Sequence, residues 1–167
     1  MARLLNLEDL AFSVFEPKVQ NRWFITLPEE FGLSKWVLHS SQRPIITSDN
    51  YDWVKPIKIN FYDPINPSTT RKLWELYVGM GYGNGMNYGN EFMSESLRKE
   101  FIQKFEKFKS GFDYTLEMLD PTGVAIETWT IKDCKITEID FGELSFNSDK
   151  PAICSMTVQP RKVILNF

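Results

Sequence analysis

The sequence predicts an α+β fold in which strands come first, two helices follow, and strands return. Three observations predict it: residues alternate with period two up to about residue 62, recur at spacings of three and four between 67 and 109, and alternate again from 111 onward. Because strand and helix stretches are segregated, the strands are expected to pair antiparallel. A chain of 167 residues fits one core, so residues 1–167 are expected to form a single domain.

The first half contains three predicted strands. Residues 21–27 alternate apolar and polar side chains, residues 35–41 form a second candidate, and residues 53–62 show the clearest alternation. Pro56 lies inside the third stretch and lacks an amide donor, so the beginning of that strand is expected at an edge or a bulge.

Two amphipathic helices are predicted next. Asn66 is the expected N-cap and Pro67 the first helical residue of a helix over 67–78, since a proline at that position loses no intrahelical bond. A second helix is predicted over 94–109 from its stripe of Leu and Phe residues. Residues 79–110, a loop rich in glycine and asparagine followed by this helix, form an insertion between the two strand regions.

Strand patterns return after residue 111. Residues 114–118 alternate, Asp120–Gly123 is a turn with proline at its second position, and a return strand begins at Val124. Residues 153–167 are predicted to form one final strand. The sequence therefore predicts a sheet of four or five strands.

Composition excludes several classes of protein. The chain carries 19 Lys and Arg against 22 Asp and Glu, a formal net charge of −3, which argues against binding nucleic acid by neutralising its phosphates. No apolar run approaches the roughly 18 residues needed to cross a bilayer. Glu8 and Asp9 interrupt what would be the apolar region of a signal peptide, so a cytoplasmic origin is expected.

No pattern of catalytic, cofactor-binding or metal-ligating residues is present. Cys134 and Cys154 belong to no CxxC pair and are expected to be buried free thiols, and the glycine-rich stretch matches neither phosphate-binding motif. His39, the only histidine, has no partner that the sequence can place, and the carboxylates of the second half are expected to form a solvated acidic face. We therefore expect no enzymatic activity; a small hydrolase built around His39 is the alternative from another class, and a protein-binding scaffold domain is a third.

The predicted strands leave sheet edges uncovered, since two helices can cover only one face. Regular edge strands in a soluble protein are usually blunted or paired with another chain. The hairpin around Asp120 and the final strand carry few residues that block pairing. Assembly through sheet edges is the expected consequence.

Five stretches of the chain carry a resemblance to a known family. They are 15–23 (FEPKVQNRW), 41–44 (SQRP), the run from 53 to 64, 116–131 (LEMLDPTGVAIETWTI) and 136–160 (ITEIDFGELSFNSDKPAICSMTVQP). Together and in this order they resemble the tail tube proteins of contractile-tailed bacteriophages, whose fold is shared more distantly with the type VI secretion tube protein.

The resemblance implies both an architecture and a role. The expected fold is an antiparallel β-sandwich or half-barrel with flanking helices, whose sheets join between subunits into a ring. Six copies would form the ring, and stacked rings would make a hollow virion tube, assembled in the host cytoplasm, through which DNA passes without specific binding. The expected partners are further copies of the chain, the tail sheath, the baseplate and the terminator. No cofactor and no membrane insertion are implied.

The resemblance also suggests which residues form the tube. The candidates for the channel wall are Thr115, Glu117, Glu127, Glu138, Asp140 and Thr157. The candidates for strands at the subunit boundary are Trp53, Ile57, Ile59, Val124, Ile126, Trp129, Met156 and Val158.

The chain departs from the family at one point. Members of the family usually carry a long hairpin between the RP dipeptide and the following strand, whereas here only eight residues separate Pro44 from Trp53. A tube-end component, either a baseplate initiator or a head-proximal terminator, is therefore the alternative to a repeated tube subunit. Residues 1–15 would form an N-terminal arm.

Overall fold

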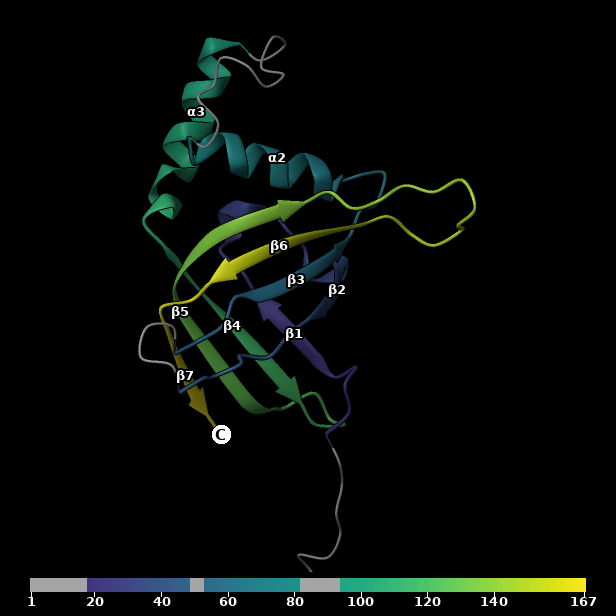
Figure 1. Ribbon diagram of the computed structural model, residues 1–167, viewed down its shortest axis with the longest axis vertical. Coiled ribbons are helices and arrows are strands. Elements are labelled where there is room, and N and C mark those ends of the chain that lie inside the picture. The colour runs from purple at the N-terminus through teal and green to yellow at the C-terminus, as the bar shows by residue number, and fades with distance from the viewer. Residues whose placement is uncertain (1–17, 49–52, 82–93) are drawn as a thin grey trace, which may run out of the picture.

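The computed structural model describes residues 18–48, 53–81 and 94–167, and they form an antiparallel sheet with helices at one end (Figure 1). In chain order the elements are β1 (Trp23–Thr26), η1 (Glu29–Phe31), η2 (Lys35–Val37), β2 (Leu38–Ser41), β3 (Ile57–Tyr62), α2 (Thr69–Gly79), α3 (Glu95–Phe105), η4 (Glu106–Lys109), β4 (Phe112–Leu119), β5 (Ala125–Asp140), β6 (Ile153–Gln159) and β7 (Lys162–Asn166). The expected α+β class and antiparallel half-barrel with flanking helices are confirmed. The glycine-rich loop, apart from its first three residues, and the expected arm over 1–15 lie outside the described residues.

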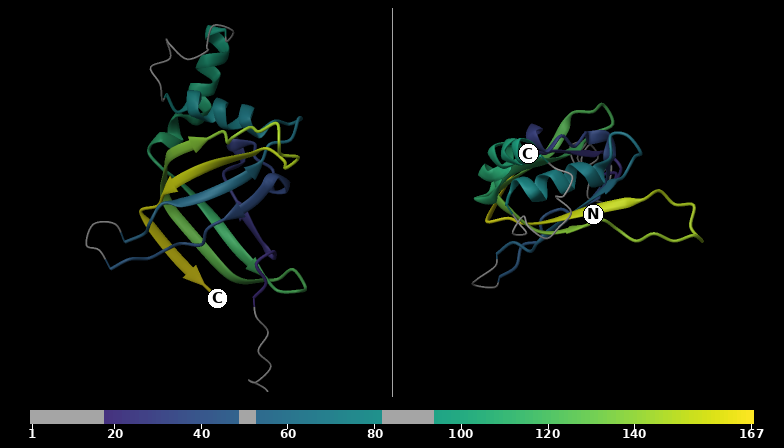
Figure 2. Two further views of the ribbon diagram at one scale, coloured as in Figure 1. Left: turned by 45° about the vertical axis from the view of Figure 1, so that its right-hand side comes forward. Right: turned by 90° about the horizontal axis from the view of Figure 1, so that it is seen from above.

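The seven strands form two layers that share β5. The order along the sheet is β1-β4-β5-β6-β3-β2, and β7 pairs with β5 beside β6. One layer is therefore β1, β4, the first part of β5, and β7; the other is the last part of β5, β6, β3 and β2. Figure 2 shows β5 curving from the lower layer into the upper one. The prediction of four or five strands was too low.

A kink at Asp133 lets β5 change layers. Asp133 has a φ of 55°, in the left-handed region that a residue other than glycine seldom adopts. Its amide donates to the Asp113 carboxylate at 2.8 Å. After this point β5 leaves β4 and β7 and pairs with β6, while Pro160 and Arg161 interrupt the opposite strand. The expected single strand over 153–167 is therefore two strands, one in each layer.

The core lies between the layers and beneath α2. Alternation predicted the buried face of β3 correctly, since Ile57, Ile59 and Phe61 are fully buried and contribute to the core, but the strand begins at Ile57, after Pro56, and not at residue 53. Leu73 and Leu76 fill it from α2. The period-two pattern of β3 and the pattern of spacings of three and four in α2 therefore both mark the side chains that face one shared core.

Three predicted elements differ from the structure in their bounds. Ser68, not Asn66, is the N-cap of α2, because its Oγ accepts a hydrogen bond from the amide of Arg71 at 3.2 Å. The stretch predicted as a strand over 35–41 begins with a single 3-10 turn, η2, and becomes β2 only at Leu38. The helix predicted over 94–109 is α3 followed by the 3-10 turn η4.

Candidate functional site

Three strands of the sheet have a free edge. Within the described residues β1 pairs only with β4, β2 only with β3, and β7 only with β5. Their outer backbone donors and acceptors are therefore available to another strand. By contrast β3 and β6 are paired on both sides, which leaves them no edge to offer to another chain.

Two candidate wall residues, Thr115 and Glu117, lie in adjacent cross-strand rows on the outer face of the first layer. Thr115 is opposite Thr26 of β1 on one side and Thr130 of β5 on the other. Glu117 lies in the adjacent row, opposite Thr128. These side chains point away from the core, because Leu116 between them is buried. This face combines hydroxyl and acidic groups with apolar side chains, because Phe24 lies opposite Glu117 and Ile164 lies opposite Thr130.

Three further candidate wall residues, Glu138, Asp140 and Thr157, lie on the outer face of the second layer. Glu138 is opposite Thr157, and Thr157 is opposite Lys58 on its other side. Asp140 is opposite Ser155. The structure thus places the predicted wall residues in two groups, one on each layer.

Glu127 belongs to neither group. It lies opposite Met118 on the core side of β5 and is only 4% exposed. Its carboxylate accepts hydrogen bonds from Lys18 and, at 2.5 Å, from the indole of Trp129, and Arg43 lies 3.4 Å away. Burial alone would raise the pKa of Glu127, but these hydrogen bonds and cations outweigh it and hold the pKa below its usual range.

The candidate boundary residues are mostly core residues or lie outside the strands. Ile57, Ile59, Met156 and Val158 are at most 1% exposed. Trp53 is 66% exposed and precedes β3. Val124 is exposed in the turn before β5, whereas Ile126 and Trp129 are half-buried in β5.

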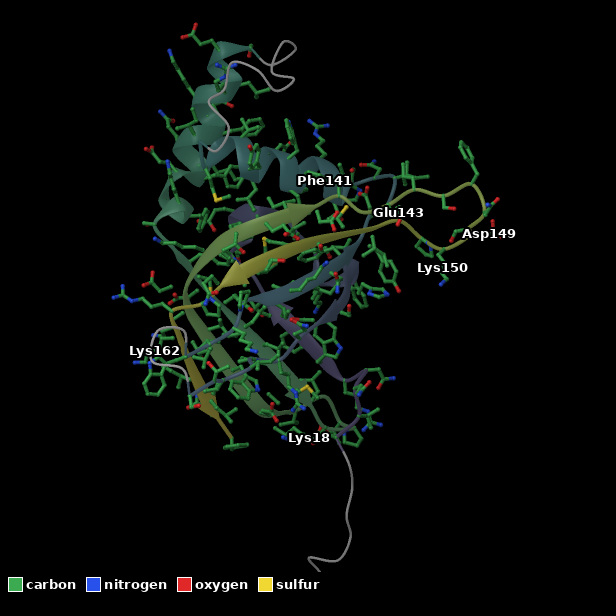
Figure 3. All side chains as sticks on the ribbon, in the orientation of Figure 1. Lys18, Phe141, Glu143, Asp149, Lys150 and Lys162 are labelled. Atoms are coloured by element: carbon green, nitrogen blue, oxygen red, sulfur yellow. The ribbon has the colours of Figure 1, made fainter. Side chains whose placement is uncertain are left out.

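Two projecting segments carry exposed apolar side chains that sequence reasoning did not single out. Residues 141–152 connect β5 to β6 as a long loop, on which Leu144 is 86% exposed and Phe146 fully exposed. Figure 3 shows Glu143, Asp149 and Lys150 on this loop, far from Lys18. The apolar residues inside the turn-rich run FGELSFNSDKPA were the available signal, because a loop has no core of its own to bury them.

The second projecting segment is a hairpin before β3. The amide of Lys55 donates to the carbonyl of Ile45, and the amide of Thr47 to that of Trp53, each at 2.9 Å. Ile46, which is 58% exposed, bridges to Val54. A short hairpin thus occupies the position where the family resemblance implies a long one.

A cleft of about 750 Å³ lies between β1 and β2. Its lining includes Trp23 and Leu116 at the base, Lys35 and Arg43 at the rim, and His39. His39 Nδ1 lies 3.1 Å from Ser40 Oγ, and its ring packs edge-on against Tyr62. The lining that the described residues provide contains no carboxylate, so it offers no pair of acids beside His39.

Helix length and the grouping of metal-ligating side chains bear on two further kinds of site in the described ranges. No helix there is both long and apolar enough to cross a membrane. No group of three or more His, Cys, Asp or Glu side chains in the same ranges is arranged to hold a metal ion.

Comparison with known proteins identifies the fold. No protein-family model matches the chain, and no curated protein matches its sequence. Among solved structures, a chain from the sheath/tube terminator of the extracellular contractile injection system PVC has a TM-score of 0.54 at 13% identity, covering 93% of this chain and 100% of that one. A chain from the PVC sheath-tube complex has a TM-score of 0.52 at 12% identity, covering 94% and 96%.

A third structure extends the comparison to a tube end. A chain from the tube-terminating cap of the anti-feeding prophage has a TM-score of 0.53 at 12% identity, covering 92% of this chain and 93% of that one. This protein therefore has a fold found in contractile injection systems, as the resemblance in sequence predicted. At these identities the comparisons establish the shared fold.

Proposed function

We propose that the chain is a structural subunit of the tube of a contractile injection system, such as a phage tail, and has no enzymatic activity. The free edges of β1, β2 and β7 carry this proposal, because they leave the sheet of one copy incomplete. Pairing between copies would satisfy those backbone groups, and a closed ring would leave no edge exposed.

Six copies per ring is the stoichiometry we infer. With about four wall strands from each subunit, a sixfold ring has about 24 strands, and barrels above roughly 16 strands enclose an aqueous channel. Thr115, Glu117, Glu138, Asp140 and Thr157 are the proposed wall residues. An anionic and hydroxyl-rich wall would repel phosphates and let DNA pass without sticking.

The projecting segments would join rings to each other and to partners. The exposed apolar residues of the loop over 141–152 and of the hairpin before β3 need a partner surface to be shielded from water. A second ring, the sheath, the baseplate or a terminator would supply it. A repeated subunit would stack into tubes, whereas a tube-end component would form rings that do not extend.

Electron microscopy of the purified protein tests this proposal. We expect sixfold rings, and tubes if the chain is the repeated subunit. Persistent monomers at high concentration, or rings of another symmetry, would contradict it. A proline introduced into residues 124–131 to block strand pairing would not test assembly alone, because that part of β5 is paired with β4 and β7 within one copy.

A charged residue on the free edge of β7 is a sharper test. Ile164 is half-buried and lies opposite Thr130 on the outer face. Lysine on an edge strand opposes pairing with another chain, so Ile164→Lys should abolish rings while leaving thermal unfolding of the monomer nearly unchanged. The matched control is Val124→Lys in the exposed turn, which should assemble normally.

A further inference from the structure

The two projecting segments leave the sheet on opposite sides. Figure 1 shows the loop over 141–152 extending to the right of β6, whereas the arms of the hairpin before β3 extend to the left. The view from above in Figure 2 shows the same separation, with the body of the protein between the two segments. Within one copy, the apolar side chains of one segment therefore cannot shield those of the other.

The loop over 141–152 surrounds an apolar hollow. The ladder between β5 and β6 ends at the pair Asp140 and Ser155, and beyond it the two arms of the loop separate. The space between them measures about 700 Å³, and Leu144 and Phe146 are part of its lining. Both side chains are also the most exposed apolar groups of the loop. The loop thus offers a concave apolar surface to a side chain of another molecule.

The hairpin before β3 presents a projecting side chain of matching character. On its described arms, residues 42–48 and 53–56, Trp53 and Ile46 are both more than half exposed. The amide of Thr47 donates to the carbonyl of Trp53 at 2.9 Å, which ties the two arms together at the tryptophan. Tryptophan is among the residue types most enriched at the positions that dominate binding between proteins.

The charges of the two segments are also complementary. Lys55 is exposed on the hairpin. The loop carries two carboxylates, Glu143 and Asp149, against one cation, Lys150, and all three are labelled in Figure 3. Among the described residues, none of these four side chains forms an ion pair. Lys55 can therefore pair with a carboxylate of the loop in another copy without breaking an ion pair of its own.

We propose that the hairpin before β3 of one copy docks on the loop over 141–152 of a second copy, with Trp53 in the hollow and Lys55 beside the carboxylates. The inference rests on the proposed assembly of identical copies and names the surface that shields both segments. Because each copy carries the hairpin on one side and the loop on the other, the contact is heterologous and repeats from copy to copy, in a closed ring or an open filament. It is made by segments outside the seven strands, so the free edges of β1, β2 and β7 remain for strand pairing.

Single cysteines test this pairing in the full-length protein. Ile46→Cys places a thiol on the hairpin and Ser145→Cys places one in the lining of the hollow, and both variants keep Trp53. Mixed in equal amounts and treated with a short bismaleimide, they should give a peptide linked through the two introduced cysteines, detected by mass spectrometry. The mixed dimer should exceed the dimers that either variant forms alone by about tenfold or more. The native thiols do not compete, because Cys134 and Cys154 are at most 1% exposed.

The outcomes separate this inference from the proposed function. In the control, Val124→Cys replaces Ser145→Cys, and its linking to Ile46→Cys should stay at background because the turn at Val124 lies outside the contact. Dimers of one variant with itself, formed as readily as the mixed dimer, would overturn the inference, since a heterologous contact does not bring equal residues together. A lack of linking where electron microscopy shows sixfold rings overturns the inference alone, whereas a lack of linking in persistent monomers overturns the proposed function as well.

The two most exposed tryptophans provide a second measurement that needs no cysteine. Trp53→Ala should weaken self-association in sedimentation velocity by about tenfold or more, because it removes the side chain that enters the hollow. The matched control is Trp36→Ala in η2, which removes another exposed indole and should change self-association by less than about twofold. Both variants should unfold at nearly the native temperature, since neither side chain belongs to the core. Equal weakening by the two variants, or none by Trp53→Ala, contradicts the inference.

Discussion

Lys18, which lines the cleft between β1 and β2, forms an ion pair with Glu127, 109 residues away in the sequence and outside the lining of the cleft. The Glu127 side chain is 4% exposed and the Lys18 side chain 41% exposed, and the pair joins the chain just before β1 to the core side of β5. Trp129 donates to the same carboxylate from two residues along β5. A buried anion is tolerated here because each of its oxygens has a partner.

Glu127→Gln should therefore destabilise the fold. At pH 7 we expect a loss of about 1–3 kcal/mol in the free energy of unfolding, because the variant leaves Lys18 and Arg43 without their counter-charge. The pKa of Glu127 is lowered in the folded state, so its contribution is present above the carboxyl's ordinary pKa and is lost as pH falls through the folded value. Urea titrations at pH 7 and at about pH 3 should show the difference from the native protein shrinking.

The control for this variant is Glu117→Gln on the outer face of β4, which should change stability by less than about 0.5 kcal/mol. Equal losses for both variants, or a loss at Glu127 that does not depend on pH, would contradict the role of the ion pair.

Glu127 also shows which strand faces could be predicted as buried from the sequence and which could not. Glu127 and Trp129 are two residues apart and so share one face of β5, but a partner 109 residues away leaves no local signal that this face is buried. The outer faces of Thr115 and Glu117 followed from the buried residues between them. Whether those faces line a channel depends on other copies, which no pattern within one chain encodes.

The errors in the predicted elements have local causes. Residues 153–167 alternate almost throughout, yet Pro160 and Arg161 split them between two layers because β5 kinks opposite them at Asp133. At the start of α2, both Asn66 and Ser68 are good capping residues, and the choice is decided by Asp63, which binds the first turn beside Ser68.

Asp63 stabilises the beginning of α2, and Asp63→Ala should weaken it. The carboxylate accepts hydrogen bonds from the amide of Thr70 at 3.0 Å, from its hydroxyl at 2.6 Å, and from Ser68 Oγ at 3.2 Å. Burial opposes ionisation, but these bonds prevail and lower the pKa of Asp63. We expect a loss of about 1–2 kcal/mol at pH 7, measured by chemical denaturation and diminishing as the carboxyl is protonated in acid.

Asp149→Ala, in the exposed loop between β5 and β6, is the matched control for Asp63→Ala and should have no measurable effect. A loss at Asp63 that persists unchanged in acid would show that the charge is not what holds the turn.

Gly79 is required where α2 meets α3. A Cβ at this position would lie 2.4 Å from Cδ2 of Phe105 and 2.6 Å from the carbonyl oxygen of Phe101. Gly79→Ala should lower the free energy of unfolding by about 1–3 kcal/mol through overpacking. Gly81→Ala is the comparison: nothing lies within 4 Å, so only its φ of +74° opposes the change, at about 1 kcal/mol. Thermal denaturation in which Gly81→Ala costs more would rule out this contact as the constraint.

Unlike the substitutions above, replacing Tyr114 by phenylalanine should not lower the free energy of unfolding. The residue is 2% exposed, and its hydroxyl has no hydrogen-bond partner among the residues described. Tyr114→Phe fills the same space without burying an unpaired polar group, so stability at pH 7 should be unchanged or up to about 1 kcal/mol higher. Tyr114→Ala should instead lose about 3–5 kcal/mol to the cavity.

The pH dependence of Tyr114→Phe supplies an independent check. Burial, with a smaller effect from Cys134, raises the pKa of Tyr114, so the contribution of the neutral phenol is complete below the ordinary tyrosine pKa of about 10 and is lost as pH rises beyond it. Denaturation at about pH 10.5 should therefore favour the phenylalanine variant over the native protein by more than at pH 7. A clear loss of stability in Tyr114→Phe at pH 7 would mean that the hydroxyl has a partner in solution.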